Sequence, residues 1–332
     1  MKGLVRDRLL WIIAGLFALY FVFPYSQLLM EVPIWGLLAI SFNLMFGYAG
    51  LFSFGHAALF AIGAYTMGIL ILHFHVNIFL GILAGSAMSA LAAMIVGWIS
   101  IRRHGVYFAL LTLAFNEVIY FTIIQLRSLT GGDDGLRGIH RPDLNFGFWS
   151  ISLQKPMVFY FFILVILGIS VLCIRRVVNS PFGSVLVGIR ENEKRIDSVG
   201  YNPRYYKIIV FTISGFFAGL AGTIFCVNMK FAALSFAHWS LGAEVMMMSV
   251  LGGTGSLYGP LVGAGLVTVM RSLLSLVWDR WLLILGVVFV FSVMFFRGGV
   301  LKVLEDMVFG RFQCFGRGEK DRGLKWKHLM KA

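Results

Sequence analysis

Charged residues are scarce in this sequence: Asp, Glu, Lys and Arg make up 13% of its 332 residues. Soluble globular proteins contain about 25% charged and about 45–50% apolar residues, whereas 59% of the residues here are hydrophobic. That apolar content also excludes a disordered chain, which cannot keep so much apolar surface in water. The composition therefore predicts an integral membrane protein.

Ligand-forming and catalytic motifs are scarce as well. The three cysteines, Cys173, Cys226 and Cys314, form no C-x-x-C pair, and the seven histidines show no metal-ligand spacing, so we expect no disulfide framework, metal or cofactor. No Gly-Lys pair occurs anywhere, which excludes a phosphate-binding loop, and G-x-S-x-G and H-E-x-x-H are missing too. We therefore predict a protein that is not an enzyme, and any ATP-driven work would require a separate ATPase chain.

Long hydrophobic runs, by contrast, fill most of the chain. A helix needs about 20 mainly apolar residues to cross a bilayer, and ten segments approach that pattern, the shortest of which carries Glu244. They are residues 9–30, 33–53, 56–73, 77–101, 105–126, 156–174, 206–228, 236–251, 257–277 and 281–296. The prediction is an all-α, polytopic membrane helix bundle of about ten spans, with some broken or short helices.

The net charge of +13 reflects the orientation of this bundle. With the N-terminus inside and ten crossings, 21 of the 28 basic residues fall in the inside segments, which are 1–8, 102–104, 175–207 and 297–332. The positive-inside rule predicts such a bias, so both termini are expected in the cytoplasm and no nucleic-acid partner is needed to explain the charge. We divide the chain into a transmembrane domain, 1–310, and a basic cytoplasmic tail, 311–332, which either lies on the lipid bilayer or simply extends from it.

Two loops outside the spans are distinctive. The outside loop, 127–155, contains a glycine-rich turn at 130–135. The inside loop, 175–205, is predicted to form a helix, with Ser180 as its N-cap, Pro181 in its first turn and Gly200 as its stop signal. Physical chemistry alone leaves two interpretations of this helix open: a solvated charged segment, or a rigid element on which a partner docks.

Glycines and buried polar residues are the candidates for a transport path. Small residues allow close helix packing, but glycines can also mark broken helices whose backbone lines a cavity; the candidates are Gly47, Gly50, Gly55, Gly252, Gly253 and Gly255. Polar groups at membrane depth either join neighbouring helices or face a polar path; these are Asn43, Thr112, Asn116, Glu117 and Glu244, with Arg271 at similar depth.

Five stretches, in their order and spacing, resemble one family: the membrane permeases of ABC importers for branched-chain amino acids, of the LivM type. The stretches are residues 41–65, 105–115, 130–136, 180–193 and 251–260. The resemblance implies a permease that translocates branched-chain or other neutral amino acids across the bacterial inner membrane. A urea or short-chain amide permease of the same family remains an alternative, as does, from another class, an ion-coupled secondary transporter.

The resemblance also implies partners and a coupling site. In such permeases an acidic residue followed about nine positions later by glycine marks the coupling helix that docks on the ATPase, and Glu191 and Gly200 have this spacing. Arg190, Asn192 and Glu193 would belong to the same cytoplasmic coupling helix. The implied partners are two ABC ATPase subunits, a second homologous permease of the LivH type and a periplasmic substrate-binding protein.

Overall fold

The computed structural model describes residues 26–141, 144–145, 150–277, 281–295 and 299–302. The first three long helices are α2 (Ser26–Ala49), α3 (His56–Phe74) and α4 (Ile78–Ser100). They are followed by α5 (Val106–Gln125), α7 (Pro156–Val178), α8 (Pro181–Ser198) and α9 (Pro203–Met229). The last three are α10 (Trp239–Gly252), α11 (Gly259–Val277) and α12 (Trp281–Phe295).

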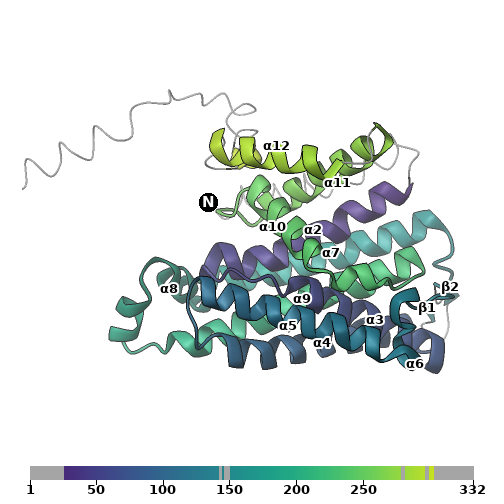
Figure 1. Cartoon of the computed structure of the whole chain (residues 1–332), viewed down its shortest axis with the longest axis horizontal. Coiled ribbons are helices and arrows are strands. Elements are labelled where there is room, and N and C mark those ends of the chain that lie inside the picture. Colours follow the sequence, from purple (N-terminus) through teal and green to yellow (C-terminus); the bar gives the residue numbers. More distant parts are fainter. Residues whose placement is uncertain (1–25, 142–143, 146–149, 278–280, 296–298, 303–332) are drawn as a thin grey trace, which may run out of the picture.

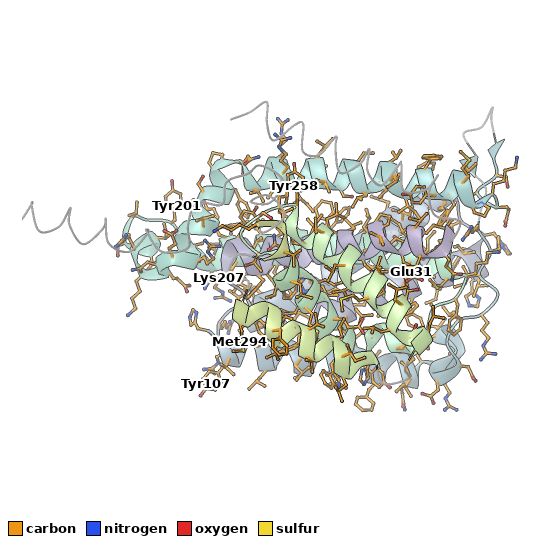
Figure 2. The ribbon with its side chains drawn as sticks, turned by 90° about the horizontal axis from the view of Figure 1, so that it is seen from above. Glu31, Tyr107, Tyr201, Lys207, Tyr258 and Met294 are labelled. Carbon is orange, nitrogen blue, oxygen red and sulfur yellow. The ribbon has the colours of Figure 1, made fainter. Side chains whose placement is uncertain are left out.

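The long helices lie side by side along the longest axis of the molecule (Figure 1). At one end of this bundle lies α8; at the other lie α6 (Arg127–Thr130) and the antiparallel strands β1 (Leu144–Asn145) and β2 (Ser150–Ile151). Two short 3-10 helices, η1 (Gly132–Asp134) and η2 (Leu234–Ala237), complete the connections. Figure 2 shows Lys207 and Glu31 toward opposite ends of the bundle.

The core forms where α2, α3, α4 and α9 pack together. Glycine makes the closest approaches possible: a Cβ at Gly63 or Gly222 would collide with a backbone carbonyl oxygen of the facing helix, that of Gly219 or Phe60. Aromatic rings fill the remaining space, with Trp35 stacked on Phe60 at 5.7 Å between ring centroids. The bundle thus combines small-residue helix contacts with a buried aromatic cluster, as membrane helices commonly do.

Helix starts and stops follow ordinary local chemistry. Proline occupies the first turn of α7, α8 and α9, where its missing N–H is not needed. Ser180 caps α8, and Asn202 caps α9 by accepting a hydrogen bond from the backbone N–H of Arg204 at 3.1 Å. The predicted helix in the inside loop is therefore confirmed, and so is the stop at Gly200, whose φ is +95°.

The helical membrane bundle is confirmed, with seven helices among the described residues that are long and apolar enough to cross a membrane. The helices α10 and α12, with 14 and 15 residues, are shorter than these seven. The predicted first span, 9–30, lies largely outside the described residues. The predicted break between residues 30 and 33 is wrong, because α2 continues through Glu31 and Pro33.

The loop 127–155 carries its predicted glycine turn. Gly131, Gly132 and Gly135 all have positive φ, which suits glycine because it has no Cβ. A backbone bridge joins Leu136 to Ala232, and Arg141 reaches the end of α9, where its guanidinium donates a hydrogen bond to the backbone oxygen of Asn228 at 3.2 Å. Partial burial lowers the pKa of Arg141 from its ordinary value. These contacts fix the loop against the end of the bundle.

Candidate functional site

Helix α8 carries the predicted coupling residues and lies at one end of the bundle. Its buried face consists of Gly183, Leu186 and Ile189, while Glu191 is exposed. The helix kinks at Asn192, whose φ of −159° and ψ of 97° are not helical. The kink has a local cause: the Asn192 side-chain oxygen accepts a hydrogen bond from the backbone N–H of Arg195 at 3.1 Å, so Asn192 caps the last turns as a new helix start.

α8 is attached to the bundle at two points, one on each side of the kink at Asn192. At the first, the Arg190 guanidinium donates a hydrogen bond to the backbone oxygen of Gly47 in the last turn of α2. The backbone also approaches closely here, since a Cβ at Gly50 would lie 2.9 Å from Cγ of Arg190. Gly50 has a φ of +70°, so both its backbone conformation and its neighbour favour glycine.

At the second attachment point Glu193 meets Lys207 of α9. The carboxylate oxygen lies 2.6 Å from the Lys207 ammonium nitrogen, and the lysine side chain is only 7% exposed. His104, in the connection between α4 and α5, lies 3.5 Å from the other carboxylate oxygen of Glu193. A buried ammonium requires such a partner, because burial without one is costly. Glu193 therefore joins α8 to two other parts of the bundle.

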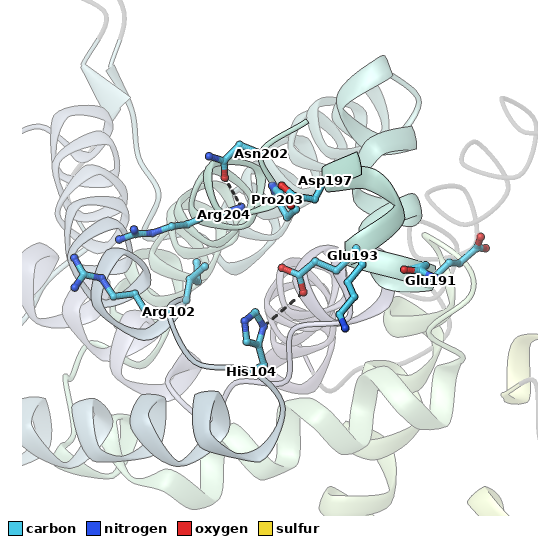
Figure 3. A pocket seen from close by; sticks show the side chains of 11 residues that line it. Arg102, His104, Glu191, Glu193, Asp197, Asn202, Pro203 and Arg204 are labelled. Atoms are coloured by element: carbon cyan, nitrogen blue, oxygen red, sulfur yellow. Dashed lines mark hydrogen bonds and ion pairs between the residues drawn. The ribbon is translucent and has the colours of Figure 1, made fainter. Parts of the chain in front are cut away.

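An open groove of about 820 Å³ lies beside this junction (Figure 3). Its walls carry both charge signs, because the acidic residues Glu191, Glu193 and Asp197 of α8 and the basic residues Arg102 and Arg204 all line it. Gly200 ends the segment, and a Cβ added to it would meet no atom within 4 Å. Glu191 and Gly200 thus both lie at the exposed tip of the molecule, where another chain can reach them.

Four of the six predicted helix-break glycines, Gly50, Gly55, Gly253 and Gly255, lie in two connections that meet near the end of α2. The other two do not break a helix, because Gly47 lies inside α2 and Gly252 is the last residue of α10. A Cβ at Gly47 would collide with the Asn43 side-chain oxygen and come 2.6 Å from the backbone oxygen of Thr254. The Asn43 amide donates a hydrogen bond to the backbone oxygen of Ser256 at 3.0 Å. The structure therefore brings Asn43 and Gly47 against the segment between α10 and α11 that contains the second glycine cluster.

Members of that second cluster differ in environment. Gly252 packs against the backbone of Gly259, Gly253 has a φ of +108°, and Gly255 is exposed with open space around it. In the first cluster, Gly55 is buried in the non-helical segment that leads into α3. Both connections are non-helical as expected, since residues 50–55 separate α2 from α3 and residues 253–258 separate α10 from α11.

Thr112 and Asn116 lie about one turn apart in the middle part of α5, and both hold the start of α3. The Thr112 hydroxyl accepts a hydrogen bond from the backbone N–H of Phe54 at 3.2 Å, and the Asn116 side-chain oxygen accepts one from Ala58 at 2.8 Å. The Asn116 amide also donates to the backbone oxygen of Ala237 at 2.9 Å. These polar side chains satisfy backbone groups that helix ends leave unpaired.

Glu117 is placed differently from its neighbour Asn116. It lies on an open groove of about 450 Å³ along α5, which is lined with Val118, Phe121, Thr122 and Gln125. Val118 and Phe121 are 59% and 63% exposed, so this side of α5 is not covered by the described part of the chain. Glu117 therefore points toward the outside of the single chain rather than into its core.

Glu244 belongs to a network that sequence reasoning recognised only in part. Arg271 of α11 lies 3.5 Å from the Glu244 carboxylate on α10 and 3.1 Å from that of Glu31 on α2. Its guanidinium also lies over the Trp35 ring, 5.2 Å from the centroid. Glu31 is not among the residues predicted at membrane depth, because its charge indicated the end of a span. The unusual Arg271 in an apolar segment was the available signal that acidic partners exist elsewhere.

These features define a class: a polytopic helical membrane protein with a charged helix attached to one end of its bundle. Within the described residues, no group of three or more His, Cys, Asp or Glu side chains is placed to hold a metal ion. Residues 25–293 match the family described as branched-chain amino acid transport system / permease component, and the chain belongs to this family. The family resemblance noted from the sequence is thus confirmed.

Individual relatives agree with this membership. The chain is 28% identical over 291 residues to the high-affinity branched-chain amino acid transport system permease protein LivM of Escherichia coli (strain K12), covering 82% of this chain and 68% of that protein. It is 26% identical over 287 residues to the probable branched-chain amino acid transport permease protein LivM of Methanocaldococcus jannaschii, covering 76% of this chain and 81% of that protein. No solved structure matches the chain.

Proposed function

We propose that this protein is the membrane-spanning permease subunit of an ATP-driven importer for branched-chain or other neutral amino acids. The observation that carries the proposal is the family match over residues 25–293, which includes all of α2 to α11 and most of α12. It is supported by the names of the relatives, which are permease proteins of branched-chain amino acid transport systems. The chain itself translocates the substrate, and ATP hydrolysis belongs to partner chains.

The coupling element in this proposal is α8. Glu191 and Gly200 are exposed at the end of the bundle. Arg190, before the kink, attaches α8 to α2, and Glu193, after it, attaches α8 to α9 and to the connection before α5. An ATPase that pushes on the tip would therefore move three parts of the bundle together. Two ATPase subunits, a second homologous permease of the LivH type and a periplasmic binding protein complete the proposed importer.

The proposed topology keeps both termini in the cytoplasm of the bacterial cell and counts about ten spans over the domain 1–310. The seven candidate spans and the two shorter helices α10 and α12 account for nine of them, and the tenth is assigned to the part of the predicted first span that precedes α2. Loop 175–205 then lies in the cytoplasm and loop 127–155 on the periplasmic side. Their placement at opposite ends of the bundle supports this arrangement (Figure 1).

The proposed translocation path follows α2, α5 and α10. Asn43, Thr112 and Asn116 contribute to its wall by holding non-helical backbone in position, because each has a hydrogen bond to a connection or to the first turn of α3. Glu244 is held by Arg271 on the side of α10. Glu117, on the open side of α5, has the most direct access to a passing solute.

Reconstitution of the complete importer tests this function. The chain is co-purified with its ATPase subunits, second permease and binding protein, placed in proteoliposomes and supplied with ATP and radiolabelled leucine. We expect uptake that requires ATP and is competed by isoleucine and valine but not by urea or acetamide. Competition by the amides alone, or uptake driven by an ion gradient without ATP, would contradict the proposal.

A second arm tests the coupling assignment. Replacing Glu191 by Ala together with Gly200 by Ala should abolish ATP-dependent leucine uptake while the permease still inserts into the membrane and accumulates normally. Asp134→Ala is the control, because Asp134 is an exposed acidic residue at the opposite end of the bundle, away from α8. Normal uptake by the double variant would show that α8 is not the coupling element.

A further inference from the structure

Glu117 lies at mid-depth in the membrane-crossing helix α5. It is residue 12 of a 20-residue helix, so about 16 Å of helix precedes it and about 12 Å follows it. Its neighbour Asn116 lies on the inner face of α5, where that side chain is fully buried and bonded to the backbone of α3 and η2. A carboxylate at this depth is costly in hydrocarbon, so it normally faces protein or a water-filled path.

Within the described residues, Glu31 and Glu244 have a cationic partner, whereas Glu117 forms no ion pair. Glu31 and Glu244 both pair with Arg271. Among the residues that the structure describes, no Lys, Arg or His lies within 4.0 Å of the Glu117 carboxylate in an ion pair. The described part of the chain therefore pairs no positive charge with this group, and a cation that approaches along the open groove can bind it.

The surroundings of Glu117 are open and chemically mixed. α5 is the least buried of the seven candidate spans, and its groove places Thr122 and Gln125 beside the exposed apolar side chains of Val118 and Phe121. A face turned to lipid tails gains nothing from a carboxylate, a hydroxyl and an amide in one row. The same row suits a path through which a small polar solute with an apolar part travels.

We propose that Glu117 lines the translocation path and binds the ammonium group of the transported amino acid, an inference that rests on the importer function proposed above. The carboxylate complements the substrate's one positive charge, and Val118 and Phe121 provide apolar contact for a branched aliphatic side chain. Urea and simple amides have no ammonium group, so this residue favours amino acids over them. The second permease chain would close the groove from the opposite side.

Uptake by the reconstituted importer tests the role of Glu117. Because a hydrogen bond to a charged group is stronger than a neutral one, Glu117→Gln should lower the rate of leucine uptake per complex by about tenfold or more. Glu117→Asp should recover part of that rate. Subunit assembly, thermal stability and the ATPase activity stimulated by the binding protein should stay at wild-type levels. The control is Ser275→Ala, which removes an exposed hydroxyl from another membrane helix, α11, and should leave uptake unchanged as well.

Each result decides a separate point. Wild-type uptake by Glu117→Gln would overturn the binding role, and loss of complex assembly in that variant would show that Glu117 instead joins the two permeases. If the wild-type importer itself takes up no leucine, the proposed function fails and this inference fails with it. Normal uptake by the wild-type complex with a defect only in Glu117→Gln supports both.

Water access to the groove provides an independent test. In a variant without native cysteines, Val118→Cys should react with a membrane-impermeant thiol reagent in the assembled importer. Leu83→Cys on α4 is the matched control, because Leu83 is 61% exposed and Val118 is 59% exposed in the single chain. Labelling of neither position in any nucleotide state would show that the α5 groove is not a water-filled path and would overturn the proposal.

Discussion

Arg190 of α8 donates a hydrogen bond to the backbone oxygen of Gly47 in the last turn of α2. The last carbonyl groups of a helix lack partners within that helix and carry partial negative charge, so a guanidinium is well suited to bind them. Because α2 lies at the centre of the bundle, this contact connects the proposed coupling helix directly to the core. Movement of α8 would therefore displace the end of α2 and the non-helical segment that follows it.

Removal of this guanidinium should uncouple the importer. Arg190→Gln retains a polar side chain but loses the charge, which weakens the contact with Gly47 by about 1.5–3 kcal/mol. We expect ATP-driven leucine uptake to fall several-fold while ATP hydrolysis by the assembled complex persists. Arg195→Gln is the control on the same helix, since Arg195 is exposed; equal losses in the two variants would contradict a specific role for Arg190.

The Glu193–Lys207 pair predicts an ordered series of stabilities. Glu193→Gln leaves the buried Lys207 ammonium without a carboxylate and should cost about 1–3 kcal/mol. Lys207→Met should cost less, because Glu193 is 35% exposed and retains His104. The double variant should be more stable than Glu193→Gln alone, since it removes the unpaired charge. Thermal unfolding in detergent measures the order, and strictly additive losses would contradict it.

Close helix contacts predict opposite effects of alanine at different glycines. Gly222→Ala places a Cβ against the backbone oxygen of Phe60, which cannot move without separating α3 from α9, so we expect a loss of about 1–3 kcal/mol. Gly286→Ala in α12 has open space around it and should be neutral or stabilising by up to about 1 kcal/mol, because alanine favours helix. Thermal unfolding midpoints check both, and equal shifts would contradict the packing.

Much of the fold follows from local sequence signals. Hydrophobic length predicts the membrane helices, and Ser180 before a proline in the first turn predicts the start of α8. The structure shows the same kind of start for α9, with Asn202 before Pro203. The kink inside α8 also has a local cause, because Asn192 prefers to cap a new helical turn over continuing the old one. A run of charged residues around Asn192 concealed that signal.

Pairings between distant segments explain what sequence reasoning missed. Glu31 resembles a span end until Arg271, 240 positions away, is known to neutralise it. The way in which Thr112 and Asn116 hold backbone in position becomes visible only when Phe54, Ala58 and Ala237 are seen as their partners. Hydrophobicity and capping act over a few residues, whereas these pairings depend on how helices pack, which a single sequence does not specify.

The Glu31–Arg271–Glu244 network predicts a large effect from one substitution and recovery by two more. Arg271→Met leaves two partly buried carboxylates without their cation, and loss of one partner of a buried pair costs about 3–5 kcal/mol. Arg271→Lys should fall between this variant and wild type, because a point charge cannot serve both acids and lie flat on Trp35. Adding Glu31→Gln and Glu244→Gln to Arg271→Met should restore most of the loss, since no unpaired charge remains.

A surface arginine provides the comparison for this network. Arg137 lies 3.9 Å from Asp134, and both side chains are more than three quarters exposed, so Arg137→Met should cost less than about 1 kcal/mol. Thermal unfolding of the purified variants in one detergent measures all of these effects. If Arg271→Met matches Arg137→Met, or if the added glutamines destabilise it further, then α2, α10 and α11 are not held together by charge pairing and packing alone joins them.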